Sequence, residues 1–117
     1  DRLVLNFGHT LGHAIEQYYH YEKFSHGEAV GIGMLQITRS AIIKGLTKTG
    51  VDHQIEEILK KYDLPTHCGI YSEDLKQAMA LDKKNIHKKL SYVLLRDIGE
   101  SYIYPSDLTF IDEVKEI

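Results

Sequence analysis

The segment that decides the fold is Gly27–Lys44, which reads GEAVGIGMLQITRSAIIK. Its first two turns are apolar almost all the way round, and polar residues return only at Thr38, Arg39 and Ser40. A helix that is apolar on every side is normally buried by its neighbours. Gly45 follows where a helix commonly ends. We therefore expect a central, buried helix around which the other elements are arranged.

Further helices are predicted on both sides of this segment. Apolar residues recur with helical spacing from about Asn6 to Tyr19 and from about Asp52 to Tyr62, and Ser72 begins a shorter helix that reaches about Leu81. The residues that we expect to face the core are Leu11, Ala14, Ile15 and Tyr18 in the first helix and Ile55, Ile58 and Leu59 in the second.

The apolar spacing changes toward the end of the chain. β-favouring residues at 90–95 and 101–104 flank a turn that contains Gly99, which predicts one hairpin. After Pro105 we expect a last amphipathic helix. Its apolar stripe would be formed by Leu108, Ile111 and Val114. The predicted fold class is mainly α, a single helical domain over residues 1–117 with one small β-hairpin near the C-terminus.

The composition limits the classes of function. A chain of 117 residues suits one domain with a substantial core. The formal net charge of −3, with both signs interspersed, provides no basic surface for nucleic acid, and no apolar run approaches the roughly 20 residues that span a bilayer. Cys68 is the only cysteine, so we expect a buried core residue and no internal disulfide. These features predict a cytoplasmic protein that binds neither nucleic acid nor a membrane.

Three histidines suggest a metal site. His9 and His13 are four residues apart and, with Glu16, lie on the side of their helix opposite the apolar one. Imidazoles at this spacing have Cβ atoms about 5–6 Å apart and can reach one ion. His26 precedes the central helix, where the helix dipole favours a neutral imidazole that keeps a lone pair. With Glu16 or Glu28 they could bind zinc, iron, cobalt or manganese, although the spacing alone is equally compatible with a structural role.

Four motifs carry a more specific resemblance. Residues 6–16 (NFGHTLGHAIE), 26–34 (HGEAVGIGM), 64–66 (LPT) and 82–85 (DKKN) resemble, in order, the signature sequence of 3-dehydroquinate synthase. The resemblance covers nearly the whole chain and implies the C-terminal helical domain of that family. Its members convert 3-deoxy-D-arabino-heptulosonate 7-phosphate to 3-dehydroquinate and phosphate in the shikimate pathway of aromatic amino acid biosynthesis. The implied reaction is a cycle of oxidation, phosphate elimination, reduction and ring closure that uses zinc and NAD.

The resemblance also assigns roles to residues. It makes His9 and His26 ligands of zinc, with cobalt or another divalent metal as alternatives, and His13 a catalytic, substrate-contacting residue in the proton-transfer network. The other side chains that it implies as contacts to the phosphorylated sugar-acid substrate are Arg2, Asn6, Lys84 and, less favoured, Lys83. Such a substrate needs cationic and hydrogen-bonding partners, which these residues provide.

The chain departs from the family in two respects. It has no Gly-x-Gly-x-x-Gly loop and lacks the glutamate that is the family's third zinc ligand. It also starts without a methionine, and apolar residues follow directly from Leu3. We therefore expect the later part of a longer, homodimeric enzyme whose NAD is bound by an N-terminal domain absent here, and we expect the isolated chain to be inactive. Alternative interpretations are another sugar-phosphate cyclase, a metal-dependent alcohol or glycerol dehydrogenase, or a non-catalytic metal-binding helical module.

Overall fold

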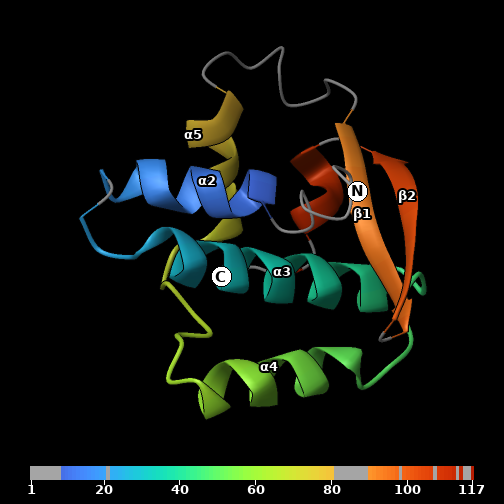
Figure 1. Ribbon diagram of the computed structural model, residues 1–117. Helices are drawn as coiled ribbons and strands as arrows, with labels where there is room; N and C mark the ends of the chain where they lie inside the picture. Colours follow the sequence, from blue (N-terminus) through green and yellow to red (C-terminus); the bar gives the residue numbers. More distant parts are fainter. Residues whose placement is uncertain are drawn as a thin grey trace.

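A long helix, α3 (His26–Ile43), lies at the centre of the computed structural model, between α2 (His9–Tyr18) and α4 (Val51–Lys61) (Figure 1). The structure describes residues 9–20, 22–80, 90–97, 99–106, 108–112, 114 and 117. Ten of the 18 residues of α3 are buried, on all sides of the helix, which confirms the expected central helix. Gly45, with a φ of +76°, follows its last turn in a left-handed conformation that side chains disfavour.

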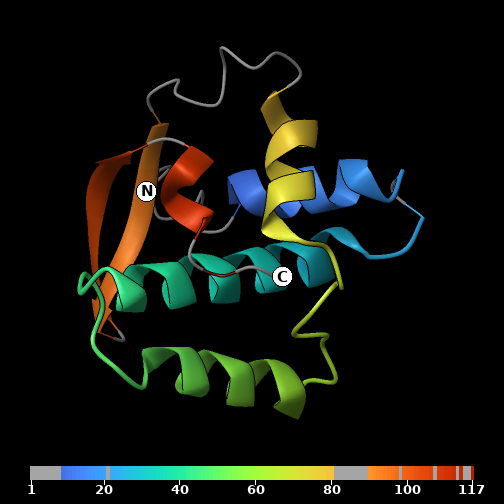
Figure 2. The same cartoon turned by 180° about the vertical axis from the view of Figure 1, so that it is seen from behind.

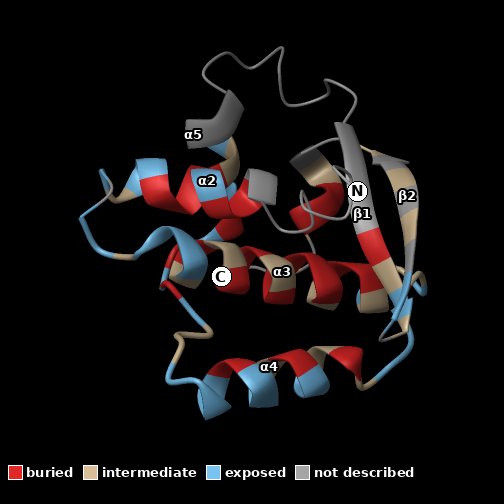
Figure 3. Cartoon of the chain, viewed as in Figure 1, coloured by how far each residue is buried: buried red, intermediate tan, exposed pale blue. Residues whose placement is uncertain are grey.

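Helix α4 covers one side of α3. Leu35 of α3 forms a buried cluster with Val51, Ile55 and Leu59, which recur every fourth residue along α4. Figure 3 shows buried positions on the α4 side that faces α3 and exposed positions on the outer side. The expectation that Ile58 points inward is wrong, because α4 is covered on one side only and Ile58 is 53% exposed.

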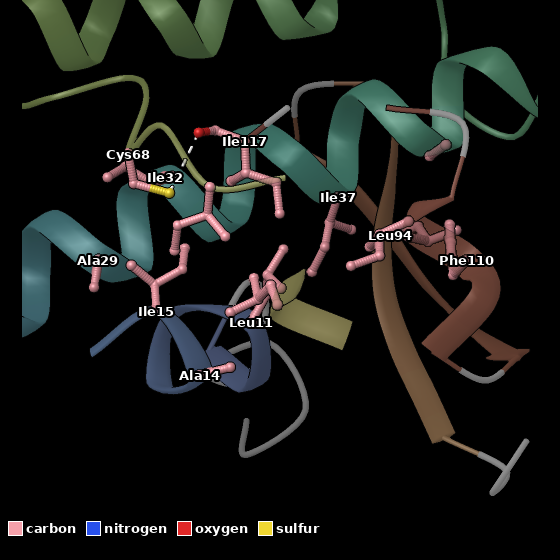
Figure 4. Close-up of a cluster of buried hydrophobic side chains, with 14 residues drawn as sticks. Leu11, Ala14, Ile15, Ala29, Ile32, Ile37, Cys68, Leu94, Phe110 and Ile117 are labelled. Atoms are coloured by element: carbon pink, nitrogen blue, oxygen red, sulfur yellow. Dashed lines mark hydrogen bonds between the residues drawn. The ribbon is translucent and has the colours of Figure 1, made fainter. Parts of the chain in front are cut away.

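The larger core lies on the other side of α3, between α3 and α2 (Figure 4). Leu11, Ala14 and Ile15 of α2 are buried there, as the apolar spacing predicts. Tyr18 does not join them and is 40% exposed, because it lies at the end of α2 with its ring edge-on to Tyr19. Helix α5 (Ser72–Ala80) crosses α2 and closes this core from behind, within one residue of its predicted bounds (Figure 2).

A two-stranded antiparallel hairpin lies at the end of α3, as expected. Its strands are β1 (Leu90–Asp97) and β2 (Glu100–Ser106). Leu94 of β1 is fully buried in the larger core, and the hydroxyl of Tyr102 donates a hydrogen bond to the Leu46 carbonyl in the loop after α3. The mainly α fold class with one small hairpin is therefore confirmed.

The prediction of a last amphipathic helix after Pro105 is wrong. Among the residues described after the hairpin, the structure shows a short 3₁₀ helix, η2 (Leu108–Ile111), and Val114 is not helical. Beyond it, Ile117 pairs through its main chain with the segment before α5, because its carbonyl accepts from the Cys68 and Gly69 amides and its amide donates to the Ile70 carbonyl. These long-range hydrogen bonds satisfy backbone groups that a continued helix would have paired locally.

Cys68 is a core residue, as predicted. It is 5% exposed, and its Sγ lies 3.3 Å from the carbonyl oxygen of Ile117 (Figure 4). Burial raises the pKa of the Cys68 thiol, because the thiolate loses its hydration. Within the ranges that the structure describes, no helix has the length and apolar character needed to cross a membrane.

Candidate metal and substrate site

A close approach of two helices builds the candidate site. Gly12 lies on the side of α2 that faces the first turns of α3, and a Cβ atom at this position would lie 2.8 Å from the Val30 Cα and 3.0 Å from the Ala29 carbonyl oxygen. No side chain fits there, so the backbones of the two helices pass in direct contact. This close approach identifies Gly12 as a helix-packing residue.

This packing brings Glu16 of α2 to His26, the first residue of α3. The Nδ1 atom of His26 lies 2.8 Å from Oε1 of Glu16. The Glu16 side chain is 9% exposed, whereas that of His26 is 59% exposed. Sequence analysis places Glu16 on the side of α2 opposite the apolar one, and the structure shows that α3 covers that side at the level of Glu16.

The position of His26 is fixed by the N-terminal cap of α3. The Ser25 hydroxyl accepts a hydrogen bond from the Glu28 amide at 3.2 Å, and the Glu28 carboxylate accepts one from the Ser25 amide at 2.8 Å. This reciprocal pair is a capping box. Glu28, which sequence analysis considered as a metal ligand, is thus engaged in starting the helix. The spacing of Ser25 and Glu28 is a sequence signal that could have predicted this role.

The structure describes only some of the remaining predicted site residues. His13 is exposed on α2, three residues before Glu16 and therefore on the same face of the helix. His9 is the first residue of α2, and its side chain lies outside the described part of the structure. Predicted substrate contacts that also lie outside it are Arg2, Asn6, Lys83 and Lys84.

The hydrogen bond between Glu16 and His26 is compatible with His26 as a ligand of a divalent metal. A carboxylate can only accept, so Nδ1 carries a hydrogen, and in the neutral form of the ring Nε2 then carries the lone pair that a metal requires. Histidines that bind metals usually donate their other ring N–H to a carboxylate or a carbonyl in this way. Among the residues described, no group of three or more His, Cys, Asp or Glu side chains is arranged to hold an ion.

Comparison with known proteins identifies the family. The family described as 3-dehydroquinate synthase C-terminal matches residues 1–85. The chain belongs to this family. A 3-dehydroquinate synthase from Clostridium perfringens (strain 13 / Type A) is 54% identical over 113 residues, which cover 96% of this chain and 32% of the relative. One from Streptococcus pneumoniae (strain JJA) is 43% identical over 116 residues, which cover 98% and 32%.

The relatives are named as synthases, so the family is an enzyme family. The chain spans about a third of the length of these curated relatives. A solved structure has the same fold over 96% of this chain and 32% of its own, with a TM-score of 0.75 and 25% sequence identity. It is that of 2-deoxy-scyllo-inosose synthase complexed with carbaglucose-6-phosphate, NAD+ and Co2+.

Proposed function

We propose that this chain is the metal- and substrate-binding helical domain of a 3-dehydroquinate synthase, a carbon–oxygen lyase of the shikimate pathway. The substrate would be 3-deoxy-D-arabino-heptulosonate 7-phosphate, and the products 3-dehydroquinate and phosphate. The family match carries the proposal, because residues 1–85 include every side chain that we assign to the site. A homodimeric, cytoplasmic full-length enzyme is part of the proposal and rests on the resemblance alone.

His9 and His26 are the metal ligands that we propose, with zinc as the first choice and cobalt as an alternative. The Co2+ in the related cyclase structure supports a divalent metal, and the hydrogen bond from Glu16 supports His26 as a ligand through Nε2. When bound, the metal would supply Lewis acidity at a substrate hydroxyl, and NAD would supply a reversible hydride acceptor.

The other residues would bind substrate and move protons. His13 is exposed on the same face of α2 as Glu16, where an imidazole can exchange a proton with a bound substrate. Arg2, Asn6 and a lysine, Lys84 rather than Lys83, would hold the phosphate, carboxylate and hydroxyl groups. Charge-assisted hydrogen bonds from Arg and Lys to phosphate are among the strongest that proteins make.

The proposal assigns NAD to another part of the full-length protein. Dinucleotide-binding folds use a parallel sheet with a glycine-rich turn before a helix. The two strands that the structure describes form an antiparallel hairpin instead. Residues 1–117 would therefore form one helical domain, and an N-terminal NAD-binding domain would complete the enzyme.

A second candidate is another sugar-phosphate cyclase. The structural similarity to 2-deoxy-scyllo-inosose synthase, at 25% identity, favours it. The similarity to relatives named 3-dehydroquinate synthase is higher, at 54% for the C. perfringens enzyme. We therefore prefer the heptulosonate substrate, and offering the chimera described below glucose 6-phosphate as an alternative substrate would separate the two.

A chimera tests the proposed function. This chain would replace the matching third of the C. perfringens 3-dehydroquinate synthase, and phosphate release from the heptulosonate would be measured with NAD and Zn2+. We expect turnover by the chimera and none by the isolated chain. Replacing His26 by alanine should lower the turnover by about 10³-fold, because a catalytic metal contributes several kcal/mol to transition-state stabilisation.

The matched control is His53→Ala, which removes an exposed histidine from α4 and should leave turnover unchanged. Circular dichroism and NAD binding would establish that each chimera is folded. A folded chimera that binds NAD but releases no phosphate contradicts the proposed reaction. Equal turnover of the His26→Ala variant and its parent contradicts the proposed role of His26.

A further inference from the structure

We propose that Glu16 is a positioning residue that holds the imidazole of His26 in the one tautomer and orientation in which Nε2 can bind a metal. The inference rests on the proposed function, because it takes His26 as a metal ligand. It gives a role to Glu16, which acts through His26 and does not itself contact the metal. From the sequence, Glu16 is only one of several candidate ligands.

The chemistry of the pair fixes the tautomer. An ionised carboxylate has acceptor sites only, so the 2.8 Å contact to Nδ1 requires that this nitrogen carry the hydrogen. The neutral ring then has its lone pair on Nε2, which is the atom on the far side of the imidazole. A neutral imidazole without such a partner distributes its proton between both nitrogens. Glu16 thereby selects the ligating form before a metal arrives.

Burial makes this selection strong. The Glu16 side chain is 9% exposed, and a carboxylate at that depth needs a hydrogen-bond donor to offset the hydration that it has lost. His26 supplies this donor while its own side chain stays 59% exposed. The pair therefore has a buried anchoring end and an end that solutes can reach, which is the arrangement expected of a ligand and its support.

Both partners are held by rigid backbone. Glu16 lies one turn after Gly12, whose missing side chain lets α2 contact the backbone of Ala29 and Val30. His26 is the first residue of α3, directly after its N-cap Ser25 and within the capping box formed by Ser25 and Glu28. The distance between the two side chains is thus set by helix packing. Loop conformation plays little part in it.

The simpler alternative is a structural pair that joins two helices. A carboxylate beside the N-terminus of α3 would also stabilise that helix through its dipole. Glu28 already places a carboxylate in this first turn and satisfies the cap, so the helix start does not depend on Glu16. A purely structural Glu16 would affect unfolding, whereas a positioning Glu16 also controls the tautomer of His26 and the affinity for metal.

Nuclear magnetic resonance of the chain separates these roles. With ¹⁵N-labelled histidine and a His26→Ala variant for assignment, the ring nitrogens of His26 should report the proton on Nδ1. In Glu16→Ala we expect a mixture of tautomers. A titration with Zn2+ should shift the Nε2 signal, and the dissociation constant should rise about 10–100-fold in Glu16→Ala, as for other carboxylates that support a histidine ligand.

Two further variants serve as controls. Glu16→Gln keeps the shape and an acceptor oxygen, so it should keep the Nδ1–H tautomer and lose less affinity than Glu16→Ala. Glu57→Ala removes an exposed carboxylate on the outer side of α4 and should change neither readout. Unfolding curves for every variant show whether the fold is retained, and Glu16→Gln provides the test if Glu16→Ala does not fold.

The outcomes distinguish this inference from the proposed function. Zinc binding at His26 with the same affinity in Glu16→Ala as in the parent overturns the positioning role and leaves the metal site intact. An unchanged Nδ1–H tautomer in that variant overturns it as well. If neither the parent chain nor the chimera shows a zinc-dependent shift of His26, the proposed role of His26 as a ligand fails, and this inference fails with it.

Discussion

Replacing Gly12 by alanine is expected to destabilise the chain by about 2 kcal/mol, although alanine is the better helix former. The new methyl carbon would lie 2.8 Å from the Val30 Cα, against an ordinary contact of 3.4 Å or more, so α2 and α3 must separate by about 0.6 Å. Overpacking of this kind costs about 1–3 kcal/mol, and the upper end applies because the obstructing atoms belong to backbone. The gain in helix propensity offsets about 1 kcal/mol of this cost.

Thermal and urea denaturation followed by circular dichroism would measure the effect. For a chain of this size, a loss of about 2 kcal/mol lowers the melting temperature by about 6–10 °C. The matched control is Gly31→Ala in α3, where the nearest atom is the Leu59 Cδ2 at 3.0 Å, the end of a side chain that can rotate away. That variant should stay within about 1 kcal/mol of the parent. Equal losses in the two variants, or a Gly12→Ala chain as stable as the parent, would refute the reasoning.

Three other predictions concern the core and the contact between α3 and α4. Because burial raises the pKa of the Cys68 thiol and blocks access to it, iodoacetamide should alkylate the folded chain about 100-fold more slowly than the urea-unfolded chain. Similar rates would contradict this burial. Leu35→Ala should cost about 2–5 kcal/mol by the cavity that it leaves, and Ile58→Ala, at an exposed position, about 0.5 kcal/mol or less. Urea denaturation would compare the two, and equal costs would count against one-sided packing of α4. Arg39 and Glu56 form an ion pair of 3.0 Å with side chains 23% and 20% exposed, so a double-mutant cycle should give a coupling of about 1 kcal/mol. A coupling of zero would indicate a contact without energetic effect.

The main elements of the fold could be predicted from local sequence. The apolar run of 27–44 predicts the buried α3, because such a helix cannot face water on any side. The change of apolar spacing and the glycine turn predict the hairpin. The failures at Ile58 and Tyr18 have a common reason. Apolar spacing indicates which residues share a side, but neighbouring elements decide how wide a side they cover.

The candidate site could be predicted only in part. The motifs that contain His9, His13 and His26 are visible in the sequence, and they lie within the family match to residues 1–85. The partner of His26 could not be predicted in the same way. Glu16 and His26 are ten residues apart on different helices, and the helical spacing of α2 shows only that Glu16 lies opposite the apolar side of its helix. Only the position of α3 determines that this carboxylate is buried.

The sequence by itself determined the helices around a buried α3, the hairpin, the buried Cys68 and the motifs that place the chain in its family. These features depend on properties of residues close to one another in the chain. Tertiary structure decided that Glu16 contacts His26, that Gly12 serves helix packing, and that Ile117 pairs with Cys68–Ile70 where another helix was predicted. Each of these outcomes depends on which distant backbone and polar groups come together on folding, and local spacing carries no information about that choice.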